Sequence, residues 1–224
     1  MSAYNLRLAE HWGVGVSNSE HGGISRRSVL RLAVWPIALS VGQMAQAEDD
    51  QKAGEVEEVK GEAFAEKHSV RRDLDREAPL FIRDRVGTGA ASRLTMRLGR
   101  DTTLRLGELA RLVIDRYLVD AGGEINLVTG PMLFDRAVGA PPASLLIRSS
   151  YGLIAVRGTR FFAGPSNGWF GVFVDRGSVA VSAAGQQVVL RAGEGTNIRW
   201  PGAAPTRPAR WRDPRIRAAL ASVT

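Results

Sequence analysis

Cysteine is absent from the 224-residue sequence, which excludes disulfide bonds, thiolate metal sites and cysteine nucleophiles. Histidine is scarce, because His68 is the only one beyond residue 47. A serine–histidine–aspartate triad or a histidine metal site would have to be built around that residue, which stands in a charged stretch that we expect to face solvent. We therefore expect no bound metal, no cofactor and no enzyme activity.

Lysine is also rare, since Lys52, Lys60 and Lys67 are the only ones, and arginine supplies nearly all the positive charge. The chain has 30 basic and 23 acidic residues and a formal net charge of +7. This modest excess suits an anionic envelope polymer or lipid headgroups. The basic residues are not interleaved with aromatic residues as in a nucleic-acid-binding surface, so we expect no nucleic-acid partner.

A long apolar segment is missing too. The apolar run at 32–45 would span about 21 Å as a helix, short of the roughly 30 Å hydrocarbon core. Basic residues precede this run and small residues follow it, which is the layout of a bacterial export signal, similar to the twin-arginine type. The residues of this layout are Arg26, Arg27, Leu30, Ala45 and Ala47. We expect 1–47 to be an N-terminal signal helix and the protein to be periplasmic, without a stable transmembrane domain after cleavage and membrane-tethered if the signal is retained.

Beyond residue 54, the dominant hydrophobic period is two. Leu94, Met96 and Leu98 alternate with arginine and threonine, which predicts a strand with one face in the core. The same alternation recurs at Leu104 and Leu106, at Leu112 and Ile114, and at Ile125 and Leu127. Glycine-rich turn signals return every eight to twelve residues or so. The sequence predicts an all-β fold over 54–198, a single domain of many short strands arranged as a β-sandwich or a wound, solenoid-like sheet.

Several segments refine this prediction. Residues 145–147, 153–156 and 172–174 are apolar without alternation, which predicts strands buried on both faces. Hairpin turns are predicted at Asp175-Arg176-Gly177, at Ala184-Gly185 and at 165–168. Residues 107–117 fit helical spacing as well, but the run Leu112-Val113-Ile114 favours a strand.

Charged segments flank the predicted sheet. We interpret 48–53 as a mobile linker. Residues 199–224 form a basic tail rich in proline and arginine, which we expect to be a solvated terminus with one short helix over 215–223. The alternative is a cationic arm that binds an anionic envelope polymer.

A series of motifs in this region resembles the FecR-domain family. The most specific is Ala155-Val156-Arg157-Gly158-Thr159-Arg160-Phe161, which is similar to the family signature Val-Arg-Gly-Thr-x-Phe. Further pieces follow in the family's order at 54–61, 86–94, 104–114, 130–134, 174–181 and 192–195. The chain departs from the family at Asp84-Arg85, at 100–102 and at Ser149-Ser150. The resemblance covers about 145 residues and implies a stand-alone periplasmic form without the cytoplasmic sigma-factor-binding domain of the iron-transport regulators.

The motif residues are expected to be structural: Val156, Arg157, Gly158, Thr159, Phe161, Gly177 and Gly193. Gly158 would adopt a positive φ or a bulge, Thr159 would bond the local backbone, and Arg157 would pair with Asp135 or Asp175. Arg160, Trp169 and Arg176 are the candidate binding surface, although Trp169 fits the core as well as an interface.

Three functions remain open from the sequence. The first is recognition of a protein partner in envelope signalling or assembly, without catalysis, through an exposed sheet surface or edge. The second is binding of cell-wall polysaccharide by the basic tail together with Trp169, Trp200 and Trp211. The third is a hydrolase whose carboxylates converge on a cleft, with candidates Glu108, Asp115 and Asp120.

Overall fold

The computed structural model describes residues 51–118, 122–141 and 144–224, together making an all-β fold with one short α-helix. The fold-class prediction is therefore confirmed. The predicted export signal at 1–47 and the carboxylate of Asp120 lie outside the described residues, as do the side chains of Tyr117, Leu118 and Arg157. No helix in the described ranges combines the length and the apolar character that a membrane span requires.

Sixteen strands and one helix make up the described chain. Their bounds are β1 Lys52–Lys60, β2 Ala63–Lys67, β3 Val70–Asp73, β4 Pro79–Phe81, β5 Arg85–Thr88, β6 Arg93–Leu98, β7 Thr102–Leu106, β8 Arg111–Leu118, β9 Gly122–Thr129, β10 Met132–Arg136, β11 Ser144–Ser149, β12 Gly152–Ser166, β13 Trp169–Ala183, β14 Gln186–Arg191, β15 Glu194–Ile198, β16 Ala209–Arg210 and α2 Asp213–Ala221. β1 thus begins inside the segment interpreted as a linker.

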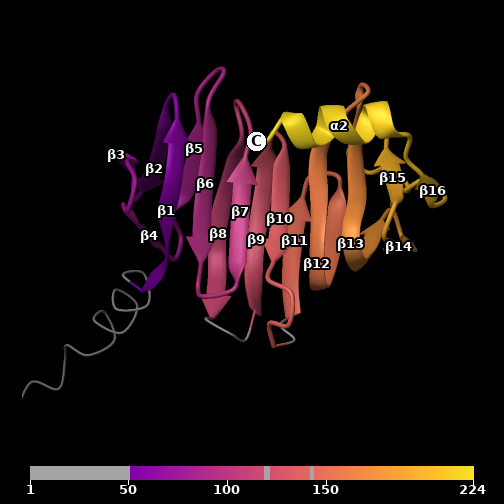
Figure 1. The fold of residues 1–224 in the computed structure, drawn as a ribbon, viewed down its shortest axis with the longest axis horizontal. Helices are drawn as coiled ribbons and strands as arrows, with labels where there is room; N and C mark the ends of the chain where they lie inside the picture. Colours follow the sequence, from indigo (N-terminus) through magenta and orange to yellow (C-terminus); the bar gives the residue numbers. More distant parts are fainter. Residues whose placement is uncertain (1–50, 119–121, 142–143) are drawn as a thin grey trace, which may run out of the picture. The chain divides into compact units, whose positions relative to one another are not determined.

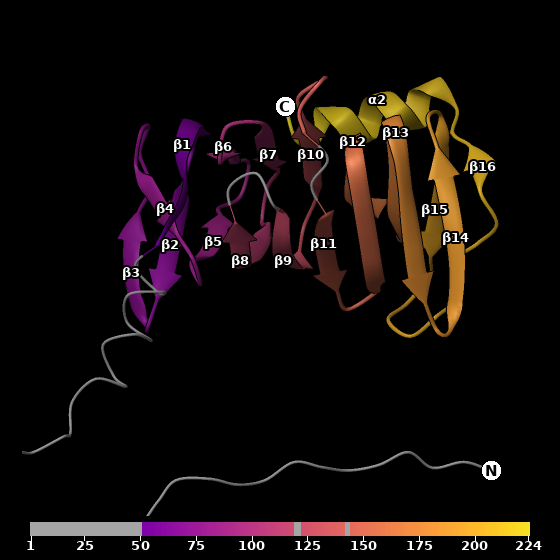
Figure 2. The same ribbon diagram turned by 90° about the horizontal axis from the view of Figure 1, so that it is seen from below.

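The strands form two facing layers within a single hydrogen-bonded sheet (Figures 1 and 2). One layer, here called the helix layer because α2 lies along it, contains β4, β1, β6, β7, β10, the second half of β12, the first half of β13, β15 and β16. The other, here called the bare layer, contains β3, β2, β5, β8, β9, β11, the first half of β12, the second half of β13 and β14. All pairings are antiparallel except that between β9 and β11. The chain passes back and forth between the layers, so the fold is a wound sheet.

The main core lies between the two layers. In β6, Leu94, Met96 and Leu98 are buried, whereas the residues between them are half-exposed. Ile114 of β8 and Ile125 of β9 belong to the same apolar cluster from the opposite layer. Alternation of period two therefore gives each strand one inward row, as the sequence predicts. Residues 111–118 form a strand, which settles the choice between helix and strand at 107–117.

β12 and β13 form a long hairpin that belongs to both layers. The register between them shifts at Arg157 and again at Arg160, and Gly158 there has a φ of +60°. A β-bulge bends its strand sharply, and the bulge between Arg157 and Arg160 (the β12 bulge) separates the half of β12 that pairs with β11 from the half that pairs with β10. The predicted turn at Asp175-Arg176-Gly177 is wrong, because these residues lie inside β13 opposite the β12 bulge. Gly177 has a φ of +84° there.

The C-terminal segment packs onto the helix layer. Trp211 is 8% exposed and stacks on Phe173 with ring centroids 5.2 Å apart. Ala219 and Val223 bury themselves in the same cluster, together with Leu133 and Phe162. The short helix predicted near 215–223 is present as α2, but the prediction of a solvated terminus is wrong, since the apolar side chains of this tail cover the sheet.

This cover explains which segments are buried on both faces. Residues 172–174 are fully buried because the tail lies over their outer side. In the bare layer, 145–147 and 153–156 instead alternate between buried and more exposed positions. The prediction of two-sided burial is wrong for these two segments, because no described element covers that outer face.

Candidate functional site

The β12 bulge folds the hairpin back on itself. Between Gly152 and Ser166 the strand would span about 46 Å if it ran straight. Instead, Tyr151 at the start of β12 stacks on Phe170, beside the hairpin tip, with ring centroids 4.5 Å apart and planes 8° apart. The bend within the family motif therefore brings the two ends of the hairpin together, although both ends lie outside the motif.

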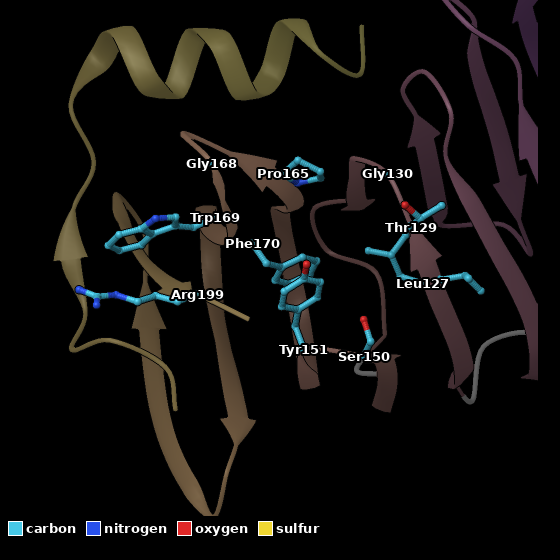
Figure 3. A pocket seen from close by; sticks show the side chains of 11 residues that line it. Leu127, Thr129, Gly130, Ser150, Tyr151, Pro165, Gly168, Trp169, Phe170 and Arg199 are labelled. Carbon is cyan, nitrogen blue, oxygen red and sulfur yellow. The ribbon is translucent and has the colours of Figure 1, made fainter. Parts of the chain in front are cut away.

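A groove of roughly 330 Å³ opens where these ends meet (Figure 3). Its floor is the stacked pair of Tyr151 and Phe170, and Trp169 and Arg199 stand on one side of it. The opposite side is built by β9 and the turn that follows it, through Leu127, Thr129 and Gly130. Val128 of β9 also lines the groove. Pro165, Gly168 and Ser150 complete the lining. The groove thus draws on β9, on the start and end of β12, on β13 and on the chain after β15.

Exposed apolar surface gathers around this groove. Trp169 is 37% exposed and Val128 is 51% exposed, so both are large apolar residues in contact with solvent. The guanidinium of Arg199 lies 4.8 Å from the centre of the Trp169 ring, which is a cation–π contact. Arg199 carries the one charge of the lining. The groove therefore offers apolar contact area with a single cation at its rim.

The C-terminal tail fixes the hairpin tip from behind. The Arg215 guanidinium lies 3.5 Å over the Trp211 ring, and it donates hydrogen bonds to Ser166 Oγ at 3.0 Å and to Asn197 Oδ1 at 2.6 Å. Burial lowers the pKa of Arg215 from its ordinary value, but a guanidinium stays charged. The tail thereby positions β12 and β15, which carry the groove.

Of the predicted surface residues, only Trp169 lies at the groove. Arg160 and Arg176 both bind Asp135, at 3.1 Å and 3.0 Å, and Arg160 also pairs with Asp175 at 3.2 Å. They stand about 23 Å along β13 from Trp169, counted over seven strand residues. The three residues predicted as one binding surface therefore lie at two separate sites. Arg160 and Arg176 belong to an ion-pair cluster beside the β12 bulge, and Trp169 lies at the groove at the hairpin tip.

The motif residues have structural surroundings. Val156 and Phe161 are buried in the main core, and Gly193, with a φ of +83°, forms the turn between β14 and β15. A side chain on Gly158 would meet nothing within 4 Å, so its backbone conformation alone requires glycine. The expected bond from Thr159 to the local backbone is wrong, because its buried hydroxyl has no hydrogen-bond partner among the described residues.

The carboxylate hypothesis finds no shared cleft in the described residues. Glu108 accepts a hydrogen bond from the backbone of Ala91, just before β8. Asp115 is exposed on β8, about 13 Å of strand beyond Arg111. The two carboxylates are therefore held in different surroundings.

Sequence reasoning missed Tyr151 and Arg199 as neighbours of Trp169. Their one available signal is a departure from the family, since Ser149-Ser150 opens the turn that carries Tyr151. Nothing in the linear pattern shows that this turn returns to the hairpin tip.

Comparison with known proteins supports the fold. The model of the family described as FecR protein matches residues 84–180. A crystal structure of a candidate anti-sigma factor from Parabacteroides distasonis ATCC 8503, at 2.50 Å resolution, superposes with a TM-score of 0.50 at 14% identity over 61% of this chain and 63% of that chain. A second such structure from that organism, at 1.65 Å resolution, gives 0.49 at 14% identity over 61% and 64%. This chain thus spans less than two thirds of those proteins, and at that identity the likeness is one of fold. No curated protein matches the chain.

Proposed function

Because residues 84–180 of this chain are a FecR domain, we propose that the protein is a non-catalytic module of envelope signalling that binds a protein partner through the groove at the hairpin tip. The groove carries the proposal. It presents Trp169, Tyr151 and Arg199 together, and these three residue types dominate the binding energy of protein interfaces. The similar crystal structure with a TM-score of 0.50 is described as a candidate anti-sigma factor, which supports a signalling role.

The exposure of the groove fits a partner rather than a buried ligand. Trp169 and Val128 are more than a third exposed, a costly arrangement for large apolar side chains unless another surface covers them. The tail supports the groove from behind, so its walls are positioned before a partner arrives. A preorganised surface of this kind loses little conformational entropy on binding.

The proposal places the module in the periplasm. This location is supported by the layout around Arg26-Arg27 and Ala45-Gln46-Ala47, which is that of a cleavable export signal. Replacing both arginines by lysine, Arg26→Lys and Arg27→Lys, should abolish export if the twin-arginine route is used. Unchanged secretion of this double variant would indicate another route.

Site-specific crosslinking in intact cells tests the partner. A photoreactive amino acid at position 169 should give one discrete crosslinked product. The matched control is position 189 in β14, where Val189 is also an exposed large apolar residue, 56% exposed, but lies in the bare layer. Recovery of monomer alone from the position-169 variant, or equal products from both positions, would contradict recognition through the groove.

Polysaccharide binding stays as a second candidate because two of its three tryptophans are accessible. Trp169 and Trp200 are 37% and 60% exposed, whereas Trp211 is buried against the helix layer. Cosedimentation of the protein with purified envelope glycan, compared with Trp169→Ala and Trp200→Ala, separates the candidates. Loss of glycan binding in these variants would favour the polysaccharide, and an unbound wild-type protein would exclude it.

A further inference from the structure

We propose that the outer face of the helix layer also holds a binding site for a phosphate group, in a cavity of roughly 310 Å³ beyond the end of α2. The site is separate from the groove at the hairpin tip. Its cationic lining consists of Lys60, Arg93, Arg105 and Arg160, with Thr95 among them. Val223 and Thr224, which follow α2, form one wall.

The strand register brings these side chains to one face. Thr95 of β6 lies directly opposite Arg105 of β7, and Arg93 stands two residues from Thr95 on the same face of β6. On the other side of β6, Lys60 of β1 lies directly opposite Arg93. Lysine opposite arginine is an unfavourable cross-strand pair, because like charges face each other. An anion between them would turn this repulsion into attraction.

The carboxylates nearby do not neutralise the cavity. Glu58 carries the only acidic side chain of its lining, and its 3.6 Å ion pair is with Lys60, where both side chains are more than half exposed. Arg160 is already held by Asp135 and Asp175. Arg93 and Arg105 are therefore left without an acidic partner among the described residues.

The state of these two arginines is what points to a ligand. Arg105 has no side-chain hydrogen bond within the described residues. Arg93 donates one bond from Nη1 to the backbone oxygen of Ser92, at 2.9 Å, while its Nε is buried without a partner. An oxyanion in the cavity would give the accessible N–H donors of both guanidinium groups an acceptor.

The donor set fits phosphate chemistry. Guanidinium groups bind phosphate oxygens through two parallel N–H bonds, and the hydroxyl of Thr95 can donate a further bond. Two carbonyls in the last turn of α2, those of Ala219 and Leu220, accept hydrogen bonds from the Ser222 and Thr224 hydroxyls. The cavity exceeds by several-fold the roughly 30 Å³ that one water occupies, so it has room for a phosphate with its ester group.

Calorimetric titration of the full chain with inorganic phosphate tests the site, against sodium chloride at equal ionic strength. We expect saturable binding to the wild-type protein and an affinity roughly tenfold lower in Arg105→Gln, which loses a charge-assisted bond. Arg105→Lys keeps the charge but not the planar fork and should fall between them. The control is Arg191→Gln in the bare layer, which removes the same kind of charge from an exposed position on β14 and should bind like the wild type. Unfolding midpoints of all variants establish that they are folded.

Two further arms identify the source of the phosphate. Cosedimentation with phosphatidylglycerol–phosphatidylcholine vesicles, but not with phosphatidylcholine alone, would support a lipid headgroup if inorganic phosphate competes. Binding of inorganic phosphate without vesicle binding would support a soluble phosphate. The site is overturned if phosphate and chloride give the same response, or if Arg105→Gln and Arg191→Gln bind phosphate equally well.

Discussion

The β12–β13 hairpin pairs the same two strands along its whole length, but the outer faces of its two halves have opposite surroundings. In the helix layer, the outward cross-strand pair is Phe162 with Phe173, and α2 and Trp211 cover it. In the bare layer, the corresponding outward pair is Ala155 with Ala180, which no described element covers. The contrast shows that large outward side chains occur where another element covers the sheet, and small ones where none does. One pair of strands can therefore build a second core on one side of a bulge and a solvent-facing sheet on the other.

The difference also explains why the groove lies where it does. The tail covers the helix layer and reaches the hairpin tip through Arg215, so the tip is held by bonds to Ser166 and Asn197. Gly195 permits this approach, because a Cβ there would lie 2.2 Å from Trp211 Nε1. Second-core packing thus positions the first residues of β13, including Trp169.

The largest loss of stability should come from truncating a side chain of the covered pair, Phe162 and Phe173. Phe162→Ala removes a fully buried ring from the cluster beneath α2, and we expect the free energy of unfolding to fall by about 3–5 kcal/mol. The matched change in the bare pair, Ala155→Ser, should alter it by less than about 0.5 kcal/mol, because the side chain is exposed. Urea denaturation measures both. Similar losses of stability in the two variants would contradict the inference that the cover by α2 and Trp211 distinguishes the two layers.

A smaller effect is expected at the bulge that separates the halves. Gly158→Ala should destabilise the protein by roughly 1–2 kcal/mol, since alanine resists the φ of +60° although nothing obstructs its methyl group. Gly185→Ala is the matched control, with a φ of +72° and equally open space in the turn after β13. Both should cost a similar amount of stability.

The two glycine variants should differ in the groove. Only Gly158→Ala alters the bend that brings Tyr151 onto Phe170, so only this variant should weaken the nuclear Overhauser contacts between those rings. An unchanged ring pair in Gly158→Ala would show that the bend does not depend on this glycine. Loss of the ring pair in Gly185→Ala would show that the contact reports stability rather than the bulge.

The sequence predicts the strands well because their signal is local. Alternating Leu94, Met96 and Leu98 mark an inward row whatever the topology. The position of the tail is different, since Trp211 and Val223 become core residues only through contacts with strands distant in sequence. Proline and arginine dominate the local pattern there and hide the few apolar anchors.

The groove was unpredictable for the same reason. Trp169 stood out beside a turn, but its neighbours Tyr151 and Arg199 reach it only through the bend at Gly158. A bulge is suggested by a glycine within a strand, yet the angle it imposes is not. The sequence therefore indicates Trp169 and the bulge at Gly158, but it does not show that the bulge brings Tyr151 and Arg199 to Trp169.

The smallest expected effect concerns the part of the helix layer beyond α2, where ion pairs rather than apolar cover occupy the outer face. A hydrogen bond from Lys52 Nζ, at 3.1 Å, and contacts with Arg97 lower the pKa of Glu55 below its ordinary value of 4.5. Because its folded pKa is depressed, Glu55 stabilises the protein above the unfolded pKa, and this contribution is lost as pH falls through the folded pKa. Glu55→Gln should therefore unfold slightly more easily than wild type at pH 7, with a smaller loss of stability than Phe162→Ala or Gly158→Ala. This difference should shrink as the pH falls through the folded pKa of Glu55. Asp75→Asn, at an exposed carboxylate without a side-chain partner in the described chain, should show no such convergence. A difference between wild type and Glu55→Gln that does not shrink as the pH is lowered would mean that packing, not charge, stabilises this end of the layer.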